Sequence, residues 1–155
     1  MKLKIGQKAP EFELPDQDGK VHKLVEYKDK WLLIYFYPKD NTSGCTKEAC
    51  TIQDNFPSFG KLDAKVIGVS GDSVKSHKKF ADEYKLPFTL LADEEKVVLK
   101  TYGVWQKKKL YGKEYMGIVR TSFLINTKGK IAKIYENVKP ELHAEEVLTD
   151  LQSPK

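Results

Sequence analysis

The chain contains little cysteine: Cys45 and Cys50 are the only two among its 155 residues. A secreted domain held together by disulfides needs more of them, and a chain of this length buries about 70% of its unfolded surface without such cross-links. Neither a Cys-x-x-Cys nor a His-x-x-x-His spacing occurs, so the sequence predicts no zinc site. A close pair of cysteines in one domain therefore indicates redox chemistry, unless both are simply small buried hydrophobic side chains.

Long apolar runs are also absent from the sequence. No stretch reaches the roughly 18 residues that a membrane-spanning helix requires, and Met1–Gly6 lacks the pattern of a secretory signal. No internal repeat is visible. We therefore expect a single domain over residues 1–155 that is soluble and cytoplasmic.

Arginine is nearly absent as well, since Arg120 is the only one and every other basic side chain is a lysine. The formal net charge of +5 is distributed among 22 acidic residues, and the only run of three lysines is Lys107–Lys109. This pattern is typical of a solvated lysine-rich surface rather than of a nucleic-acid interface. Arg120 itself lies in the apolar run Gly117–Ile125, where a guanidinium is costly to bury without partners. It therefore either pairs with a carboxylate for purely structural reasons or belongs to a functional site, and we favour the second interpretation.

The order of the predicted strands and helices indicates a layered α/β fold. Alternating side chains at 12–14 and 21–24 predict a hairpin that turns at Asp18–Gly19. The continuous apolar run Trp31–Tyr37, ended by Pro38, predicts a strand covered on both faces. Further strands are expected at 66–70, 88–91, 118–125 and 130–135, and helices from about residue 45, over 73–84 and 94–102, and from Pro140 to about Leu151. Residues 105–116 form the least regular segment. The pattern predicts a three-layer sandwich with a central mixed β-sheet, in which 118–125 and 130–135 are the antiparallel pair.

Cys45 stands where a helix is predicted to begin, after the loop that follows the Trp31–Tyr37 strand. Helix N-termini present unpaired N–H groups and a partial positive charge, which favour the thiolate form of a cysteine. Thr42 lies three residues earlier, so its hydroxyl either caps the helix in the ordinary way or touches the amide of residue 45. Gly44 leaves the approach to the sulfur unobstructed. We therefore regard Cys45 as a candidate nucleophile.

The two cysteines are predicted to face in different directions. The apolar positions of their helix form one stripe that contains Ala49, Ile52, Phe56 and Phe59. Cys45 falls on this stripe and should face a pocket, whereas Cys50 points about 140° away, toward the more exposed flank. Five helical residues separate two Cα atoms by about 8.6 Å, but a disulfide needs less than about 7 Å. If the two cysteines react with each other, the first turns must unfold locally, and Pro57 and Gly60 fit a helix that kinks or ends early.

Pro38, Thr42 and Cys45 fit the pattern Pro-x-x-x-Thr-x-x-Cys, and Cys50 follows five residues after Cys45. In these residues the chain resembles the peroxiredoxins, and the cysteine spacing resembles the bacterioferritin comigratory protein, or peroxiredoxin Q, branch of that family. The likeness covers nearly the whole chain and includes the segments 6–12, 68–70, 102–105, 115–125 and 143–148. It implies a thioredoxin-like fold with an N-terminal β-hairpin extension, in agreement with the predicted order of elements.

The resemblance also implies a role for each residue of the pattern. The Cys45 thiolate would attack the terminal peroxide oxygen and become a sulfenic acid, with release of water or an alcohol. The Thr42 hydroxyl, the amide of Cys45 and the Arg120 guanidinium would hold the thiolate and polarise the O–O bond. Pro38 would shield the sulfur from water, and Glu48 would orient Arg120 through a charge-assisted hydrogen bond.

The expected partners follow from the same family. Cys50 would condense with the sulfenic acid, and thioredoxin or a similar dithiol would reduce the resulting disulfide. We expect an enzyme that acts on hydrogen peroxide and organic hydroperoxides without a metal or organic cofactor, and without a nucleic-acid or membrane partner. Members of this branch are often monomers, and we expect the same here.

Two other functions stay open at this point. The first is a thiol–disulfide exchange protein of the thioredoxin type, although the sequence lacks the Cys-x-x-Cys motif of such proteins. The second is a non-catalytic binding module that retains the fold without the activity. We expect His77 and His143 to be structural. Trp105 and Tyr111 are expected to pack against the fold rather than to shape the pocket or a partner surface.

Overall fold

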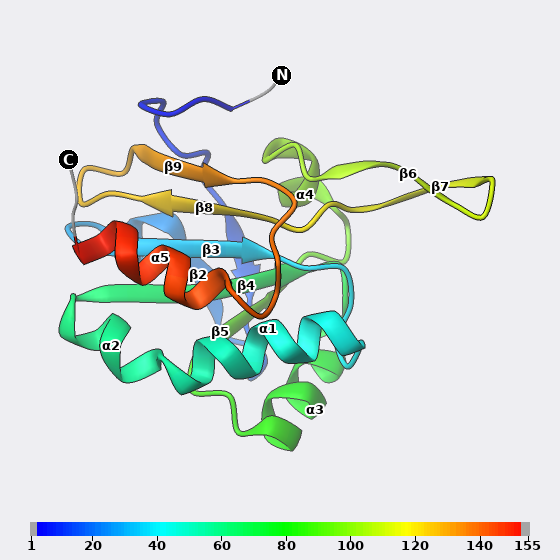
Figure 1. The fold of residues 1–155 in the computed structure, drawn as a ribbon, viewed down its shortest axis with the longest axis horizontal. Coiled ribbons are helices and arrows are strands. Elements are labelled where there is room, and N and C mark those ends of the chain that lie inside the picture. The colour runs from blue at the N-terminus through cyan, green and yellow to red at the C-terminus, as the bar shows by residue number, and fades with distance from the viewer. Residues whose placement is uncertain (1–2, 153–155) are drawn as a thin grey trace.

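A five-stranded mixed sheet forms the middle of the fold, which the computed structural model describes for residues 3–152 (Figure 1). The strands follow the order β5-β4-β3-β8-β9, with bounds Trp31–Phe36 for β3, Ala64–Ser70 for β4, Thr89–Ala92 for β5, Thr121–Ile125 for β8 and Ile131–Tyr135 for β9. β3 and β4 are parallel, as are β4 and β5, whereas β8 runs antiparallel to both β3 and β9. The prediction of a central mixed sheet is confirmed. Residues 1–2 and 153–155, at the two ends of the predicted domain, lie outside the described residues.

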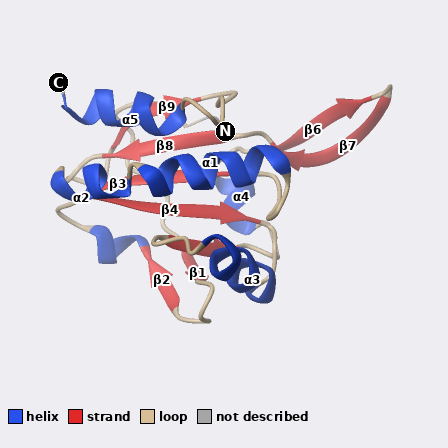
Figure 2. Cartoon of the chain, turned by 60° about the horizontal axis from the view of Figure 1, so that its bottom comes forward, coloured by secondary structure: helices blue, strands red, loops and turns tan. Residues whose placement is uncertain are grey.

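Helices cover one face of this sheet, and a shorter helix with the N-terminal hairpin covers the other (Figure 1, Figure 2). The first face carries α1 (Ser43–Asp54), α2 (Phe56–Lys61), α3 (Val74–Tyr84) and α5 (His143–Gln152). The second face carries α4 (Val97–Thr101). No helix among residues 3–152 is both long and apolar enough to cross a membrane. The three-layer architecture predicted from the element order is therefore confirmed.

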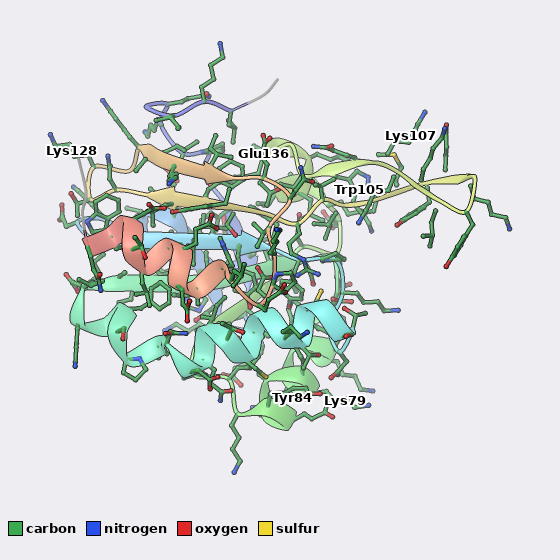
Figure 3. All side chains as sticks on the ribbon, in the orientation of Figure 1. Lys79, Tyr84, Trp105, Lys107, Lys128 and Glu136 are labelled. Carbon is green, nitrogen blue, oxygen red and sulfur yellow. The ribbon has the colours of Figure 1, made fainter. Side chains whose placement is uncertain are left out.

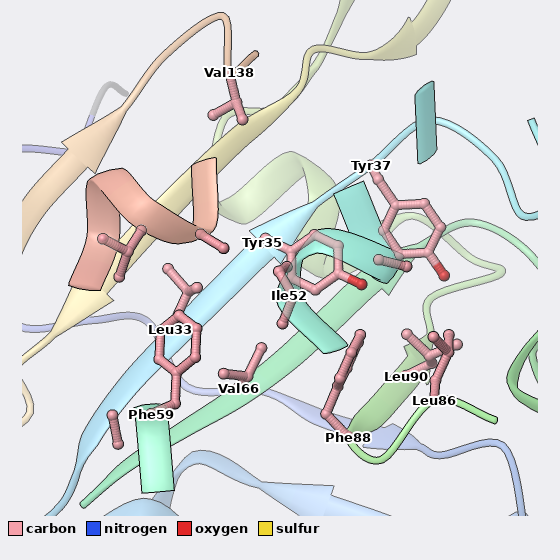
Figure 4. Packing of buried hydrophobic residues seen from close by; sticks show 14 of the residues in the cluster. Leu33, Tyr35, Tyr37, Ile52, Phe59, Val66, Leu86, Phe88, Leu90 and Val138 are labelled. Carbon is pink, nitrogen blue, oxygen red and sulfur yellow. The ribbon is translucent and has the colours of Figure 1, made fainter. Parts of the chain in front are cut away.

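β3 is buried on both faces because it lies between the two outer layers. Leu33 and Tyr35 pack against the helices of the first face with Ile52 and Phe59 (Figure 4). The alternate side chains of the same strand, such as Ile34, pack in the second cluster with residues of α4. This double burial explains why the strand appears in the sequence as an unbroken apolar run.

The N-terminal hairpin is confirmed and consists of β1 (Glu13–Pro15) and β2 (Val21–Lys23), followed by the 3-10 helix η1 (Leu24–Tyr27). The Asp16 carboxylate accepts the amides of Asp18 and Lys20 over 2.9 and 3.0 Å, which closes the turn. Gly19 has φ +83°, a value that glycine adopts without strain.

Residues 105–116 differ from the prediction that they form the least regular segment. β6 (Trp105–Leu110) and β7 (Lys113–Ile118) form a regular antiparallel hairpin that projects from the body of the protein (Figure 1). Its turn residues Tyr111 and Gly112 both have positive φ, 52° and 78°, as a two-residue turn of type I′ requires. Neither face is covered for most of its length, so no apolar alternation marks it in the sequence; Lys107 extends into solvent (Figure 3). The prediction that Tyr111 packs is likewise wrong, since it is 96% exposed, whereas Trp105 is partly buried at the base.

The predicted strand over 118–125 is interrupted. Ile118 ends β7 and Thr121 begins β8, with Val119 and Arg120 between them. The Val119 amide donates to the Val104 carbonyl over 2.9 Å, and the Arg120 carbonyl accepts the Val138 amide over 3.1 Å. Because these groups bond to segments outside the sheet, Arg120 is not part of a core strand but directly precedes one.

Two helices begin later than predicted. α4 starts at Val97 rather than at residue 94, because Lys96 has φ +64° and the Asp93 carboxylate accepts the Leu99 amide over 2.7 Å. α5 starts at His143 rather than at Pro140, since the chain first makes a turn in which the Leu142 amide donates to the Lys139 carbonyl.

The helix that carries both cysteines is interrupted as its sequence suggests. α1 begins at Ser43, slightly before the predicted start, and ends at Asp54. α2 follows with Pro57 in its first turn, where a missing N–H costs nothing. The predicted early end of the helix is confirmed.

Candidate active site

The mixed sheet brings Cys45 and Arg120 to one end of the molecule. Cys45 lies in the first turn of α1, which follows the carboxyl end of β3. β8 runs antiparallel to β3 with Thr121 opposite Phe36, so the residue just before β8 reaches the same end of the sheet. That residue is Arg120, which is 75 positions away from Cys45 in the chain.

The Arg120 guanidinium contacts the sulfur and a buried carboxylate at the same time. Nη2 donates to Sγ of Cys45 over 3.3 Å, and Nη1 donates to Oε1 of Glu48 over 2.6 Å. Cys45 is 1% exposed and Glu48 is 0% exposed, so both contacts are shielded from water. Glu48 lies one helical turn after Cys45, which lets α1 present both side chains to one guanidinium. The planar fork of arginine fits two such acceptors, whereas a lysine has only a point charge.

Burial and charge act against each other at Glu48. Removal from water raises the pKa of Glu48 to about 7, although the charge of Arg120 and its hydrogen bond favour the carboxylate. Burial also disfavours the charged form of Arg120, but Glu48 and Cys45 outweigh this effect and raise the pKa of the guanidinium. Arg120 therefore stays positively charged beside the sulfur, and Glu48 is the member of the pair that titrates near neutral pH.

Gly44 allows the guanidinium to approach the helix closely. A Cβ atom at this position would lie 3.1 Å from Nη2 of Arg120 and 3.7 Å from Cγ of Pro140. The space predicted to be open beside Gly44 is thus occupied by the Arg120 guanidinium. Pro140, which the sequence suggested only as a helix start, lies against the first turn of α1.

Thr42 occupies the position before α1, but its hydroxyl does not cap the helix. Its backbone is extended, with φ −91° and ψ 154°, and its carbonyl accepts the Thr46 amide over 2.8 Å. The hydroxyl donates to the Lys39 carbonyl over 2.8 Å instead of accepting a helix amide, so neither predicted hydroxyl contact is observed. Because the hydroxyl proton points to the Lys39 carbonyl, the lone pairs of Oγ1 point away from that carbonyl.

Cys50 lies on the same continuous helix as Cys45 but is only partly buried, in line with its predicted position on the flank. Both thiols are free. Burial, together with the charge of Asp54, raises the pKa of Cys50. Pro38, directly after the apolar run that contains β3, is partly buried at the start of the loop that leads to α1.

Tyr35 is a residue of this site that the sequence did not reveal. Within the described residues, its Oη and Oε2 of Glu48 are the buried side-chain oxygens without a hydrogen-bond partner. Burial and the charges of Glu48 and Cys45 raise the pKa of Tyr35 well above its ordinary value, so the phenol keeps its proton. Gly68 lies opposite Tyr35 on β4, and a Cβ there would come within 2.7 Å of the ring. A glycine inside an apolar strand is the sequence signal for this close packing.

One group of described residues has the side chains of a metal site, namely Asp40, Asp72 and His77. His77 uses Nδ1 in a 2.7 Å hydrogen bond to Asp40, and Asp72 Oδ2 accepts the Ser70 hydroxyl over 2.7 Å. These atoms already satisfy one another, so the cluster is a hydrogen-bonded network rather than a set of free ligands. His77 is a buried member of this network, and the sequence did not reveal its partner.

Comparison with known proteins agrees with this geometry. The model described as the AhpC/TSA family matches residues 5–134. Peroxiredoxin Bcp of Bacillus subtilis (strain 168) is 48% identical over 152 residues, which cover 98% of this chain and 97% of the relative. Peroxiredoxin Bcp of Escherichia coli (strain K12) is 43% identical over 150 residues, covering 97% of this chain and 96% of the relative. Among solved structures, a mutant of PrxQ from Xylella fastidiosa superposes with a TM-score of 0.94 at 34% identity, covering 99% of this chain and 98% of that one.

The fold is thus thioredoxin-like, and the activity of the chain is that of a thiol-dependent peroxidase. The chain belongs to the AhpC/TSA family and, within the peroxiredoxins, to the bacterioferritin comigratory protein, or peroxiredoxin Q, branch. Its substrate is a peroxide and its reductant is a thiol.

Proposed function

We propose that Cys45 is the peroxidatic residue and that Arg120 is its principal electrostatic partner. The observation that carries this proposal is the 3.3 Å contact from Nη2 of Arg120 to Sγ of Cys45, at the N-terminus of α1. The unpaired amides of the first helical turn add to the same positive field. Both features stabilise negative charge on the sulfur and on a reacting oxygen beside it.

The first chemical step transfers one oxygen atom. The Cys45 thiolate attacks the terminal oxygen of a hydroperoxide, so an S–O bond forms while the O–O bond breaks. The other oxygen leaves with the bonding electron pair and takes up a proton to become water or an alcohol, and the sulfur becomes a sulfenic acid. Arg120 lies where it stabilises the charge on the leaving oxygen, and Glu48 holds Arg120 in that orientation.

Thr42 and Pro38 complete the proposed site. With its proton donated to Lys39, the Thr42 oxygen accepts a hydrogen bond from the O–H of the peroxide. Pro38 limits the access of water to the sulfur at the start of the same loop. Hydrogen peroxide and organic hydroperoxides both present the O–H that this arrangement requires. A relative from Xanthomonas campestris is described as reducing alkyl peroxides, which supports the second class of substrate.

Cys50 is proposed as the resolving residue. Its thiolate attacks the sulfur of the sulfenic acid, the S–O bond breaks, and the oxygen leaves as water after it takes up a proton. Because ideal helix geometry separates these two Cα atoms by about 8.6 Å, the disulfide requires the first turns of α1 to unwind. Thioredoxin or a similar dithiol then reduces the disulfide, which completes an intramolecular two-cysteine cycle without a metal or organic cofactor.

We extend the proposal to the whole chain as one domain over residues 1–155 that acts as a monomer in the cytoplasm, without a nucleic-acid or membrane partner. The predominance of lysine interleaved with acidic residues supports the absence of a nucleic-acid partner. A reducing compartment fits a cycle that ends on a reduced dithiol.

The proposal is tested with reduced protein, hydrogen peroxide, thioredoxin and thioredoxin reductase. The wild type should consume peroxide in many turnovers, and Cys45→Ser should abolish consumption. Cys50→Ser should still use one equivalent of peroxide but form no intramolecular disulfide. Full activity of Cys45→Ser would contradict the assignment. If the protein reduced insulin as fast as it reduces peroxide, a thiol–disulfide exchange protein would be favoured instead.

A further inference from the structure

The loop between β3 and α1 is anchored at one buried residue. Asp40 is 6% exposed, whereas its neighbours Lys39 and Asn41 are exposed. Its carboxylate accepts the Tyr37 hydroxyl at Oδ1 over 2.6 Å. At Oδ2 it accepts the Ser76 hydroxyl over 2.8 Å and Nδ1 of His77 over 2.7 Å. Three side chains therefore converge on a carboxylate that lies five residues before Cys45.

His77 contacts Asp40 in the interior of the protein. The ring is 0% exposed on α3, with Nδ1 facing Asp40 and Nε2 lying 2.9 Å from the Leu91 carbonyl. The ring thereby links the Asp40 carboxylate of the loop to the Leu91 carbonyl of β5. Burial, and then the charge of Asp40, raises the pKa of Tyr37 well above its ordinary value, so Tyr37 remains a donor.

The backbone of the loop is held at the same point. The Asp40 amide donates to Oδ2 of Asp72 over 2.8 Å, and the Ser70 hydroxyl donates to that same oxygen over 2.7 Å. Asn41 then turns the chain with φ +60° toward Thr42 and α1. The loop is thus tied to β4 and α3 upstream of the helix turns that must unwind, whereas the residues from Asn41 to Ser43 are exposed.

We propose that Asp40, held by His77, is a positioning residue that keeps the first turn of α1 in its peroxide-reactive arrangement and opposes the local unwinding that the Cys45–Cys50 disulfide needs. This inference deepens the proposed function and rests on it. The folded first turn is the state in which Arg120 touches the sulfur. A weaker anchor lowers the population of that state, which slows attack on peroxide and brings Cys45 and Cys50 together more often.

Asp40→Asn tests the anchor, because it keeps the shape of the side chain but replaces the carboxylate that Tyr37, Ser76 and His77 contact with an amide. Ser76→Ala removes one hydrogen bond to the same carboxylate and is the milder variant. Asp16→Asn is the matched control, since Asp16 also lies 2.7 Å from a histidine, His22, but in the N-terminal hairpin. Each variant is measured in the reduced state for backbone amide exchange over residues 38–50 and for the rate constant of single-turnover oxidation by hydrogen peroxide. At excess peroxide, mass spectrometry gives the ratio of Cys45–Cys50 disulfide to Cys45 sulfinic acid.

Asp40→Asn should exchange faster over residues 38–50, react with peroxide about tenfold or more slowly, and shift the products toward disulfide. Ser76→Ala should shift all three readouts in the same direction by less, and it decides the question if Asp40→Asn does not fold. Asp16→Asn should match the wild type in all three. Wild-type amide exchange in the folded anchor variants would overturn the proposal, and so would slower oxidation with an unchanged product ratio. Amide exchange is measured without peroxide. If the wild type does not react with peroxide, the proposed function is refuted, but the exchange data still show whether Asp40 holds the first turn of α1.

Discussion

The Arg120 side chain donates hydrogen bonds to two buried partners that lie one helical turn apart. The guanidinium donates through separate nitrogens to Cys45 and Glu48, and no other arginine is present to replace it. The same contacts explain how a buried cation is tolerated here, since each desolvated nitrogen that faces the helix has an acceptor. The contacts that support the proposed catalytic role of Arg120 are thus the same contacts that allow its burial.

Arg120→Lys should slow the oxidation of Cys45 by about 100-fold, because one ammonium cannot donate to both acceptors in the geometry of the fork. The second-order rate constant with hydrogen peroxide, measured by stopped flow on reduced protein, checks this. Lys133→Met, which breaks the exposed ion pair with Asp150, is the control and should react like the wild type. A rate constant for Arg120→Lys within a factor of about two of the wild type would show that the fork is not needed.

Glu48 should make the stability of the protein depend on pH. Its folded pKa of about 7 lies above its ordinary value of 4.5, so the folded state holds the proton more tightly than the unfolded state does. The resulting stabilisation is fully present below pH 4.5 and is lost as the pH rises to about 7, with a total of about 3 kcal/mol. Glu48→Gln removes this term. The free energy of unfolding of the variant relative to the wild type should therefore increase between pH 5 and pH 8, as urea titrations of the reduced proteins will show. Parallel stability curves for the two proteins would contradict a raised pKa at Glu48.

Among the helices and strands, α1 is the one that the proposed cycle requires to be both stable and able to open. Its inner face is anchored in the core by Ala49 and Ile52, each 0% exposed, whereas its first residue, Ser43, is exposed. Gln53 also ties the helix to the end of α3, because its side-chain amide donates to the carbonyls of Tyr84 and Lys85 over 2.9 and 2.7 Å. Unwinding should therefore start at the N-terminal end of α1 and stop before Ile52.

Oxidation to the disulfide should increase amide exchange at residues 43–50 while residues 52–54 stay protected. Hydrogen exchange followed by mass spectrometry on reduced and oxidised wild type measures this difference. The Cys50→Ser variant treated with one equivalent of peroxide is the control and should keep its protection. Uniform protection along α1 after disulfide formation would mean that the helix does not open at its first turns.

The β6–β7 hairpin should be dispensable for both the fold and the peroxide step. β6 and β7 pair with each other along their whole length and project from the body of the protein (Figure 1). The tip residue Tyr111 is 96% exposed. A variant in which residues 108–115 are replaced by Asn-Gly keeps Trp105 and Ile118, which pack in the second core cluster. Its melting temperature and its single-turnover rate constant with peroxide should both stay close to the wild-type values. Loss of cooperative unfolding would show that the hairpin contributes to the core.

For the molecule as a whole, the sequence predicted those features that depend on local pattern. The double-sided burial of β3, the turn at Gly19 and the break before Pro57 each have a signal within a few residues, and all three are observed. The β6–β7 hairpin was missed because solvent covers most of both its faces and leaves no apolar alternation.

The candidate site was predictable only in part. Cys45 could be predicted as a nucleophile from its place at the start of a helix. The resemblance to peroxiredoxins supplied Arg120 and Glu48 as its partners. The network around Asp40 could not be found in this way, because it joins residues 37 positions apart whose contact depends on how α3 packs against the sheet. The predicted contact of the Thr42 hydroxyl with a helix amide is not observed, because the hydroxyl is oriented by its donation to the nearby Lys39 carbonyl.

The most direct test of the account is a rapid-quench oxidation of the reduced wild type with one equivalent of hydrogen peroxide, followed by tryptic mass mapping. The account predicts that a sulfenic acid appears first on Cys45 and that it is then replaced by a disulfide to Cys50, with loss of two hydrogens from the whole protein. A first oxidation product on Cys50, or oxidation of Cys45 no faster than that of a free thiol, would contradict it.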